Sequence, residues 1–193
     1  MRKYKIILFG STGMLGSQMI SHLSKNKKLQ IFEMNRKKKV KSIRINIANQ
    51  KELINKIKFI KPNYIINCIG WIKQKSINSK EAYMVNTQFP IFLSNLSLLL
   101  NYKLIHISTD CVFSGLKGNY KDKDYKDAKD LYGLSKNYGE VKNINTCTLR
   151  TSIIGYETAK KKFGLLEWFL SQTDKVNGYD KVYFSGLTTL EMS

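Results

Sequence analysis

Short apolar runs alternate along this chain with segments in which apolar residues recur every three or four positions. Continuous apolar runs are typical of buried strands, and the wider spacing is typical of helices with one packed face. The runs predict strands at residues 5–9, 29–34, 42–47, 64–69, 104–108 and 146–151. Because strands that alternate with helices usually form a parallel sheet, we expect an α/β fold with helices on both faces.

The predicted helices lie in the intervals between these strands. Leu15 and Leu23 bound an apolar stripe directly after the first strand. Asn49, with Glu52 three positions later, resembles a capping box and predicts the start of a helix that ends before Pro62. Further helices are expected at 89–100, 131–143 and 165–170, a polar loop at 117–130, and a short strand at 182–184.

The turn after the first strand is rich in glycine. Gly10, Gly13 and Gly16 form the pattern GxxGxxG between the first strand and the first helix. Glycine lets the backbone turn tightly and approach a pyrophosphate, whose charge is stabilised at a helix N-terminus. The spacing differs by one residue from the GxGxxG turn of many dehydrogenases. The position of the pattern favours a dinucleotide site, with an ordinary strand–helix turn as the alternative.

The end of the second strand bears on which dinucleotide binds. An acidic residue there favours NAD by binding its ribose, whereas a basic residue favours the 2′-phosphate of NADP. Glu33 lies 17 residues after Gly16, and Arg36 lies 20 residues after it. We expect NADP, with NAD left open, because Arg36 and Lys37 can pair with a phosphate. The alternative is that this basic stretch is a solvated turn.

A tyrosine and a lysine four residues apart share one face of a helix, and an ammonium near a phenol favours the phenolate. The sequence holds four such pairs: Tyr125 with Lys129, Tyr132 with Lys136, Tyr138 with Lys142, and Tyr156 with Lys160. Tyr132 and Lys136 are favoured because they flank the apolar stripe of a predicted helix. That stripe, expected to pack on the sheet, is Leu131, Leu134, Tyr138 and Val141. We expect Lys136 to lower the pKa of Tyr132.

Hydroxyl groups follow the fifth strand, at the edge of a parallel sheet where ligands bind. Thr109 at this edge can hydrogen-bond a substrate carbonyl oxygen and hold it against Tyr132. The alternative for Ser108 and Thr109 is turn capping, and for Asp110 a turn or helix cap. His106 is expected to be a strand residue without a catalytic role.

The formal net charge is +19, from 33 Lys and Arg against 14 Asp and Glu. The first 80 residues hold 19 basic and 2 acidic side chains, a balance that attracts polyphosphates. Only four basic residues are arginines, whose planar fork suits phosphate and base recognition. We therefore expect no nucleic-acid partner, and a lysine-coated solvated surface is the simpler interpretation.

The sequence also bears on location. No apolar run approaches the roughly 18 residues that cross a bilayer, and the first run is too short for a signal peptide. Three separated cysteines without a CxxC pattern predict neither a disulfide framework nor a metal site. We expect a cytoplasmic protein with no membrane partner.

Six segments carry a resemblance to a known family: GSTGMLG at 10–16, NCIG at 67–70, VNTQFP at 85–90, STDCVFSG at 108–115, YGLSK at 132–136 and LRTSIIG at 149–155. In this order they resemble the extended short-chain dehydrogenases/reductases, and among them the dTDP-4-dehydrorhamnose reductase (RmlD-like) sugar-nucleotide enzymes. The resemblance implies a Rossmann-like, doubly wound NAD(P)-binding domain over residues 1–155, with Thr109, Tyr132 and Lys136 catalytic. It implies cofactor contacts by Gly10, Thr12, Gly13, Met14, Leu15, Gly16, Arg36, Asn46, Ile47, Cys68, Ile69, Gly70, Asn86, Ser108, Tyr132 and Lys136.

The implied activity is NAD(P)H-dependent reduction of the 4-keto group of a nucleotide-linked deoxysugar, in the supply of polysaccharide precursors. Asp110 and Cys111 would contact the substrate, although relatives often have tyrosine where Cys111 stands. Residues 156–193 would begin a substrate-binding lobe that extends further in relatives, and a homodimer is left open. The alternatives are a UDP-sugar epimerase or reductase, and a non-catalytic dinucleotide-binding regulatory subunit.

Overall fold

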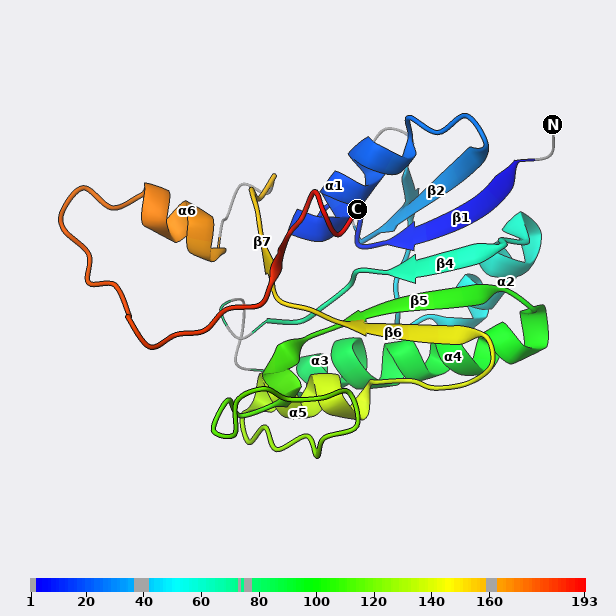
Figure 1. Ribbon diagram of the computed structural model, residues 1–193. Coiled ribbons are helices and arrows are strands. Elements are labelled where there is room, and N and C mark those ends of the chain that lie inside the picture. Colours follow the sequence, from blue (N-terminus) through cyan, green and yellow to red (C-terminus); the bar gives the residue numbers. More distant parts are fainter. Residues whose placement is uncertain (1–2, 37–41, 73, 75–77, 159–162) are drawn as a thin grey trace.

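The computed structural model describes residues 3–36, 42–72, 74, 78–158 and 163–193. At its centre lies a six-stranded parallel sheet in the order β3-β2-β1-β4-β5-β6 (Figure 1). The strands are β1 (Tyr4–Phe9), β2 (Leu29–Asn35), β3 (Ser42–Arg44), β4 (Tyr64–Asn67), β5 (Lys103–Ser108) and β6 (Thr146–Arg150). This order confirms the predicted Rossmann-like, doubly wound sheet.

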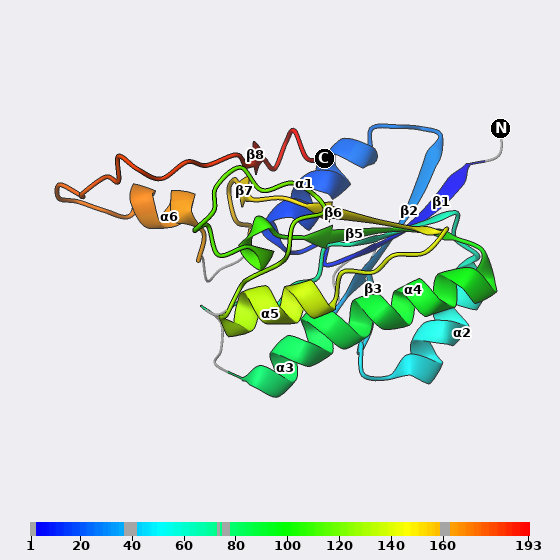
Figure 2. The same ribbon diagram turned by 60° about the horizontal axis from the view of Figure 1, so that its bottom comes forward.

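Helices cover both faces of this sheet (Figure 2). One face is covered by α1 (Met14–Leu23), and the other by α2 (Gln50–Ile60), α4 (Phe89–Leu100) and α5 (Leu131–Tyr138). The short helix α3 (Ser79–Tyr83) continues through the π-helical turn η1 (Met84–Gln88) into α4. The strands are thereby buried between two helical layers, which explains their continuous apolar runs.

Alternating side chains of β1 supply both layers of the core. Ile6 and Leu8 pack with the α1 side, whereas Ile7 and Phe9 pack with the α2 and α4 side. The ring of Phe9 meets the ring of Phe89 on α4 edge-on, with centroids 5.2 Å apart. This two-sided burial fixes β1 in register and therefore places the glycine turn that follows it.

The predicted cap of α2 is confirmed. The side chain of Asn49 accepts a hydrogen bond from the backbone N–H of Glu52 at 3.1 Å. The helix ends at Lys61, whose φ of 51° is left-handed, and Pro62 follows. Strands β3 and β4 are shorter than predicted, ending at Arg44 and Asn67.

Helix α5 differs from its prediction in length and in orientation. It ends at Tyr138 rather than at 143, and the cap residue Gly139 packs so closely on η1 that a Cβ there would lie 1.8 Å from the carbonyl oxygen of Asn86. The predicted packing of its apolar stripe is wrong: Tyr138 is 58% exposed, and Ser135 and Lys136 are buried instead. The polar face of the helix therefore points inward.

The last part of the chain forms a second, two-stranded sheet. The strand β7 (Ile153–Ile154) pairs in parallel with β8 (Leu187–Thr188), and α6 (Leu165–Leu170) projects away from the main sheet (Figure 1). The predicted helix at 165–170 is confirmed. The predicted strand at 182–184 is wrong, because these exposed residues have no strand beside them. The boundary at residue 155 stays a prediction, since β7 and β8 join its two sides.

Candidate active site

The glycine turn has a shape that only glycine permits. Gly10 has a left-handed φ of 81°, and a Cβ there would lie 3.0 Å from backbone atoms of Cys68 and Ile69. A Cβ at Gly16 would lie 2.2 Å from the carbonyl oxygen of Gly10. The turn is therefore drawn against the end of β4 and against the first turn of α1.

The N-terminus of α1 is suited to an anion. Gly13 is the cap residue and supplies no side-chain hydrogen bond, and the first turn contains no acidic residue. Thr12 is half-buried, Met14 begins the helix, and Leu15 is buried in the core on the α1 side. A pyrophosphate thus meets backbone N–H groups and the positive end of the helix dipole. These residues fit a dinucleotide.

At the end of β2 a polar group, missed by the sequence reasoning, adjoins this turn. The Ser11 hydroxyl donates to the Glu33 carboxylate at 2.7 Å, and the Asn35 amide donates to the Ser11 oxygen at 2.8 Å. Arg36 points outward, with its side chain 81% exposed and its guanidinium 3.9 Å from the Glu81 carboxylate. Lys37 lies outside the described residues. Ser11 was missed although it stands inside the glycine motif, of which every other residue was expected to contact the cofactor.

The loops after β3 and β4 form the next part of the site. Asn46 caps its own turn by accepting from the N–H of Ala48 at 3.0 Å, and Ile47 packs between two core clusters beside Ile69. Burial raises the pKa of the Cys68 thiol to about 12, against the influence of Lys136, so it stays neutral. Gly70 lies exposed at the end of this loop.

Asn86 fastens this loop to helix α5. Its amide oxygen accepts from the Trp71 N–H at 2.8 Å, and its amide nitrogen donates to the Trp71 carbonyl and to the Ser135 hydroxyl. The side chain is fully buried. Asn86 therefore supports the site through the loop, and the contact with a cofactor expected for it stays a prediction.

Thr109 and Tyr132 are brought together, as the sequence reasoning expected. Thr109 follows β5 and caps the 3₁₀ turn η2 (Asp110–Val112), accepting from the Cys111 N–H at 3.2 Å. The Thr109 side chain lies beside that of Tyr132, near enough to act on the pKa of the phenol. On the helix, Asp130 caps α5 by accepting from the N–H of Tyr132 at 2.9 Å. The two hydroxyls therefore lie together at the carboxyl edge of the sheet.

The residue after Tyr132 explains how close the two elements come. A Cβ at Gly133 would lie 2.4 Å from the Cys111 carbonyl oxygen and 2.5 Å from the Ala128 Cβ. Only glycine lets α5 approach the turn after β5 so closely. The hydroxyl pair of Thr109 and Tyr132 thus depends on this glycine.

Lys136 lies one turn further along α5 and is 4% exposed. Its ammonium donates to the carbonyl oxygen of Ile107 at 2.6 Å. Burial lowers its pKa from 10.5 to about 8, against the opposing influence of Glu140 and Cys68. The ammonium is therefore held at the last residues of β5, directly before Ser108.

The expected effect of Lys136 on Tyr132 is wrong. Burial raises the pKa of Tyr132 to about 12, and the hydrogen bond from Thr109 opposes this only in part. The negative charge of Asp110 acts in the same direction as burial. The physical reason is that the ammonium of Lys136 turns to a backbone carbonyl. Tyr132 is consequently a protonated phenol at neutral pH.

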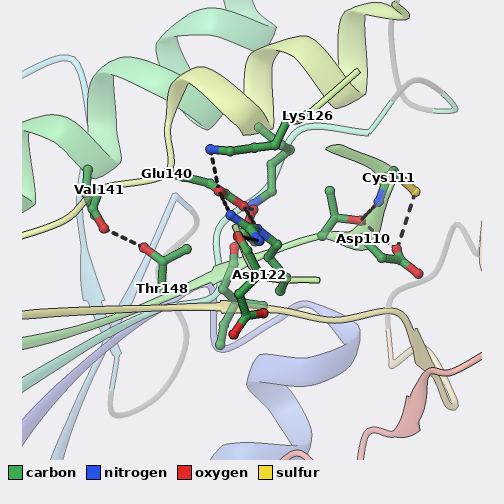
Figure 3. Close-up of polar contacts among 12 residues, drawn as sticks. Asp110, Cys111, Asp122, Lys126, Glu140, Val141 and Thr148 are labelled. Atoms are coloured by element: carbon green, nitrogen blue, oxygen red, sulfur yellow. Dashed lines mark hydrogen bonds and ion pairs between the residues drawn. The ribbon is translucent and has the colours of Figure 1, made fainter. Parts of the chain in front are cut away.

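A buried ion cluster beneath the site was also missed (Figure 3). The Glu140 carboxylate accepts from Arg150, Lys126 and the Ser108 hydroxyl, each at 2.8 Å. Burial acts to raise the pKa of Glu140, but these three hydrogen bonds outweigh it and lower the pKa to about 2. The Ser108 hydroxyl, expected to contact the cofactor, is engaged in this cluster. Lys126, Glu140 and Arg150 are widely spaced in the sequence and form no recognisable motif, so their sequence did not indicate this cluster.

Arg150 also anchors the polar loop that precedes α5. Its guanidinium donates to the Asp122 carbonyl at 2.9 Å and lies over the Phe113 ring, 5.3 Å from the centroid. The Phe113 ring stacks in turn on the Tyr120 ring, with the two centroids 4.4 Å apart. Since this loop leads directly into α5, the anchor fixes the position of Tyr132.

An open cavity of about 380 Å³ lies at the end of β6, and Asp110 is the one expected site residue that lines it. Its lining is Asp110, Leu149, Arg150, Thr151, Ser152, Ser185, Leu187 and Met192. The Asp110 carboxylate accepts from the Ser152 hydroxyl at 2.6 Å, and Cys111 is exposed. A larger hollow, of about 590 Å³, lies between the outer side of α5 and residues 124–129, and none of the expected site residues lines it.

Within the described parts of the chain, His, Cys, Asp and Glu side chains form no group of three that could hold a metal ion. In those same parts, no helix has the length and apolar character needed to span a bilayer.

His106 is fully buried beside Asn67, and burial lowers its pKa to about 3, so the imidazole is neutral.

A Rossmann sheet, a glycine turn after β1 and a Tyr–Lys pair on α5 facing the end of β5 define an extended short-chain dehydrogenase/reductase. Residues 4–174 match the family model described as the RmlD substrate binding domain. The chain belongs to this family.

Relatives with known names support this assignment. A dTDP-4-dehydrorhamnose reductase of Aggregatibacter actinomycetemcomitans is 29% identical over 139 residues, which are 70% of this chain and 45% of the relative. Methionine adenosyltransferase 2 subunit beta of Bos taurus is 22% identical over 187 residues, 94% of this chain and 53% of the relative. The chain spans about half the length of the curated relatives it matches.

A solved structure agrees with the fold. The structure of dTDP-4-dehydrorhamnose reductase from Bacillus anthracis in complex with NADP superposes with a TM-score of 0.74 at 26% identity. The match covers 87% of this chain and 59% of that one.

Proposed function

We propose that the protein reduces the keto group of a nucleotide-linked deoxysugar with NADPH. The observation that carries the proposal is the close approach of α5 to the turn after β5, which brings Tyr132 beside Thr109 at the carboxyl edge of a sheet with a glycine turn. Membership in the RmlD family and the likeness to dTDP-4-dehydrorhamnose reductases support a 4-keto-6-deoxysugar on dTDP as substrate.

The cofactor would lie across the carboxyl edge of the sheet. Gly10 to Gly16 and the N-terminus of α1 would bind its pyrophosphate, and Arg36 would bind the 2′-phosphate. The support for NADP over NAD is the exposed Arg36 side chain at the end of β2, together with the likeness to a dTDP-4-dehydrorhamnose reductase in complex with NADP. When bound, NADPH supplies a hydride to the keto carbon.

The protein's own residues would manage the oxygen and its proton. Thr109 and Tyr132 would both hydrogen-bond the keto oxygen, because their hydroxyls already lie together. As charge develops on that oxygen, the phenol of Tyr132 donates its proton to form the alcohol. The group is protonated at neutral pH and can donate, although its raised pKa makes it a weaker acid than an exposed tyrosine.

Lys136 would act on the cofactor side of this pair. Its ammonium is held at the Ile107 carbonyl, directly before Ser108 and Thr109. From there it would hydrogen-bond a ribose hydroxyl of the cofactor. The cavity beside Asp110 and Ser152 is the place for the sugar.

A second candidate is a non-catalytic, dinucleotide-binding subunit. It is favoured by one observation: a relative aligned over 94% of this chain is named as a subunit of methionine adenosyltransferase. In both cases three free cysteines support a reducing, cytoplasmic location. A homodimer stays a prediction.

One experiment separates the two candidates. The purified chain is titrated with NADPH by calorimetry, and then NADPH absorbance is followed with dTDP-linked and UDP-linked 4-keto-6-deoxysugars. Binding followed by sugar-dependent loss of absorbance supports the reductase. Binding without consumption of NADPH supports the subunit, and absence of NADPH binding contradicts both.

A further inference from the structure

Exposed lysines gather on the side of the molecule opposite the candidate active site. Since the strands are parallel, the turns that lead into β2, β4, β5 and β6 meet at one edge, on the side of the labelled N-terminus in Figure 1. The exposed lysines of this edge are Lys3, Lys25, Lys27, Lys28, Lys58, Lys61 and Lys103. They come from four separate stretches of sequence, so the fold creates this concentration of charge.

No acidic side chain dilutes this charge. The sequence contains no Asp or Glu in residues 1–32, 53–80, 82–109 or 141–156, which supply the surface of this edge. Glu140 precedes the last of these stretches, but its carboxylate is 6% exposed and is bound to Arg150 and Lys126. The edge therefore presents a field of one sign, in contrast to the mixed charges around residues 117–130.

Apolar side chains are exposed among these lysines. The exposed fractions are 53% for Tyr4, 88% for Phe59, 37% for Tyr64, 79% for Leu99 and 86% for Ile144. We name these five residues and the seven lysines the basic edge.

Contacts connect the members of the basic edge that lie at the starts of the strands. The Tyr4 N–H donates to the Lys28 carbonyl at 2.9 Å, and the Tyr4 and Tyr64 rings lie 6.2 Å apart. Tyr64 is paired in register with Lys103, whose ammonium donates to the Ile144 carbonyl at 3.4 Å. The row therefore runs without a break across the strands from β2 to β6.

We propose that the basic edge docks the protein onto an anionic lipid bilayer. Lysine ammonium groups are attracted by anionic headgroups, and exposed aromatic and aliphatic side chains enter the boundary between headgroups and acyl chains. The two signals together meet the requirement for stable peripheral binding. This contact concerns the bilayer surface alone, and it revises the expectation of no membrane partner.

Lipid fits this surface better than nucleic acid does. All seven charged residues of the basic edge are lysines, whereas phosphate recognition in nucleic acids favours the planar fork of arginine. Docking through this edge also leaves the carboxyl edge of the sheet facing solution, open to soluble ligands. The proposal does not depend on the proposed enzymatic function.

The test measures sedimentation of the full 193-residue chain with vesicles. Vesicles of phosphatidylcholine containing phosphatidylglycerol are compared with vesicles of phosphatidylcholine alone at about 0.1 M salt, where the Debye length is about 10 Å. Binding only to the anionic vesicles is expected. Equal binding to both, or tighter binding to RNA than to the anionic vesicles, would overturn the proposal.

Matched variants locate the surface. The triple variant Lys25→Gln, Lys27→Gln, Lys58→Gln should weaken vesicle binding by about 100-fold, because each lysine near an anionic surface contributes about fivefold. The control variant Lys121→Gln, Lys123→Gln, Lys129→Gln removes the same charge from the opposite edge. An equal loss in both variants would mean that net charge alone drives binding, which overturns the proposal.

A second pair of variants tests the apolar contacts. Phe59→Ala should weaken vesicle binding by about tenfold, whereas Leu116→Ala, at a residue that is 89% exposed near the other edge, should leave it unchanged. Circular dichroism checks that each variant is folded. Unchanged vesicle binding by a folded Phe59→Ala variant would contradict the proposal that exposed apolar side chains contribute to binding.

Discussion

Replacing Lys136 by methionine should make the protein more stable while it damages the candidate site. The ammonium is 4% exposed, and burial lowers its pKa from 10.5 to about 8. A shift of about 2.5 units corresponds to roughly 3 kcal/mol of destabilisation of the charged form at neutral pH. Methionine has a similar length and carries no charge, so Lys136→Met removes this cost without leaving a large cavity.

One contact is lost in the variant. The ammonium donates to the Ile107 carbonyl at 2.6 Å, and methionine cannot replace this hydrogen bond. Its loss costs about 1 kcal/mol. The net expectation for Lys136→Met at pH 7 is therefore a gain of about 2 kcal/mol in the free energy of unfolding.

The stability difference between Lys136→Met and the wild type should depend on pH. Between about pH 8 and 10.5 the unfolded chain binds more protons at Lys136 than the folded chain does. The wild type therefore gains stability from this residue as the pH rises through that window, and the variant does not. The advantage of Lys136→Met should be full at about pH 7 and lost by about pH 10.

The assay is urea unfolding at the two pH values, followed by the fluorescence of Trp71, which is buried in the native state. Lys129→Met, at an exposed position before α5, serves as the control and should change stability by less than about 0.5 kcal/mol at either pH. A destabilised Lys136→Met, or an advantage that is the same at both pH values, would refute the reasoning.

Three further predictions concern the turn, the cofactor and the ion cluster. Gly16→Ala should lower stability by about 2 kcal/mol and abolish NADPH binding in calorimetry, because its Cβ would lie 2.2 Å from the Gly10 carbonyl oxygen; Gly178→Ala, where a Cβ would meet no atom within 4 Å, should do neither. Arg36→Ala should weaken NADPH binding by about tenfold and leave NADH binding unchanged, and equal effects on both would remove its role. Glu140→Gln should cost about 3 kcal/mol near neutral pH, and the difference from the wild type should vanish as the pH falls from 4.5 to about 2. Acid unfolding curves that stay apart at low pH would contradict this account of Glu140.

The sheet could be predicted from sequence because its signal is local. Each strand of β1, β2, β4 and β5 is a short apolar run, and burial between two helical layers requires just such runs. The glycine turn was equally readable, since the conformation of Gly10 and the contact at Gly16 permit no other residue.

Helix α5 shows where local signals fail. Its apolar stripe predicted that Tyr138 would pack inward, yet Lys136 and Ser135 are buried because Asn86 and the Ile107 carbonyl bind them. These partners come from distant stretches of the chain, and the spacing of residues in the helix does not indicate them. The same holds for Glu140, whose partners Arg150 and Lys126 are brought together only by the fold.

The pKa of Tyr132 shifts in the direction opposite to the expected one, and the cause is again a contact with a distant part of the chain. A lysine one turn away predicts a lowered pKa when both side chains face the same solvent-filled cleft. In the structure the lysine bonds backward to β5, and burial dominates the phenol. The position of Tyr132 was predictable, and its electrostatic environment was not.

The rate of NADPH oxidation in Tyr132→Phe tests the central claim most directly. Phenylalanine keeps the ring and removes only the hydroxyl that lies beside Thr109, so NADPH affinity measured by calorimetry should stay within about twofold of the wild type. With a dTDP-linked 4-keto-6-deoxysugar, the rate should fall by at least about 100-fold, because proton donation is lost. Tyr138→Phe, on the same helix and also followed by a lysine four residues later, should retain the wild-type rate. Equal rates in Tyr132→Phe and the wild type would contradict the account.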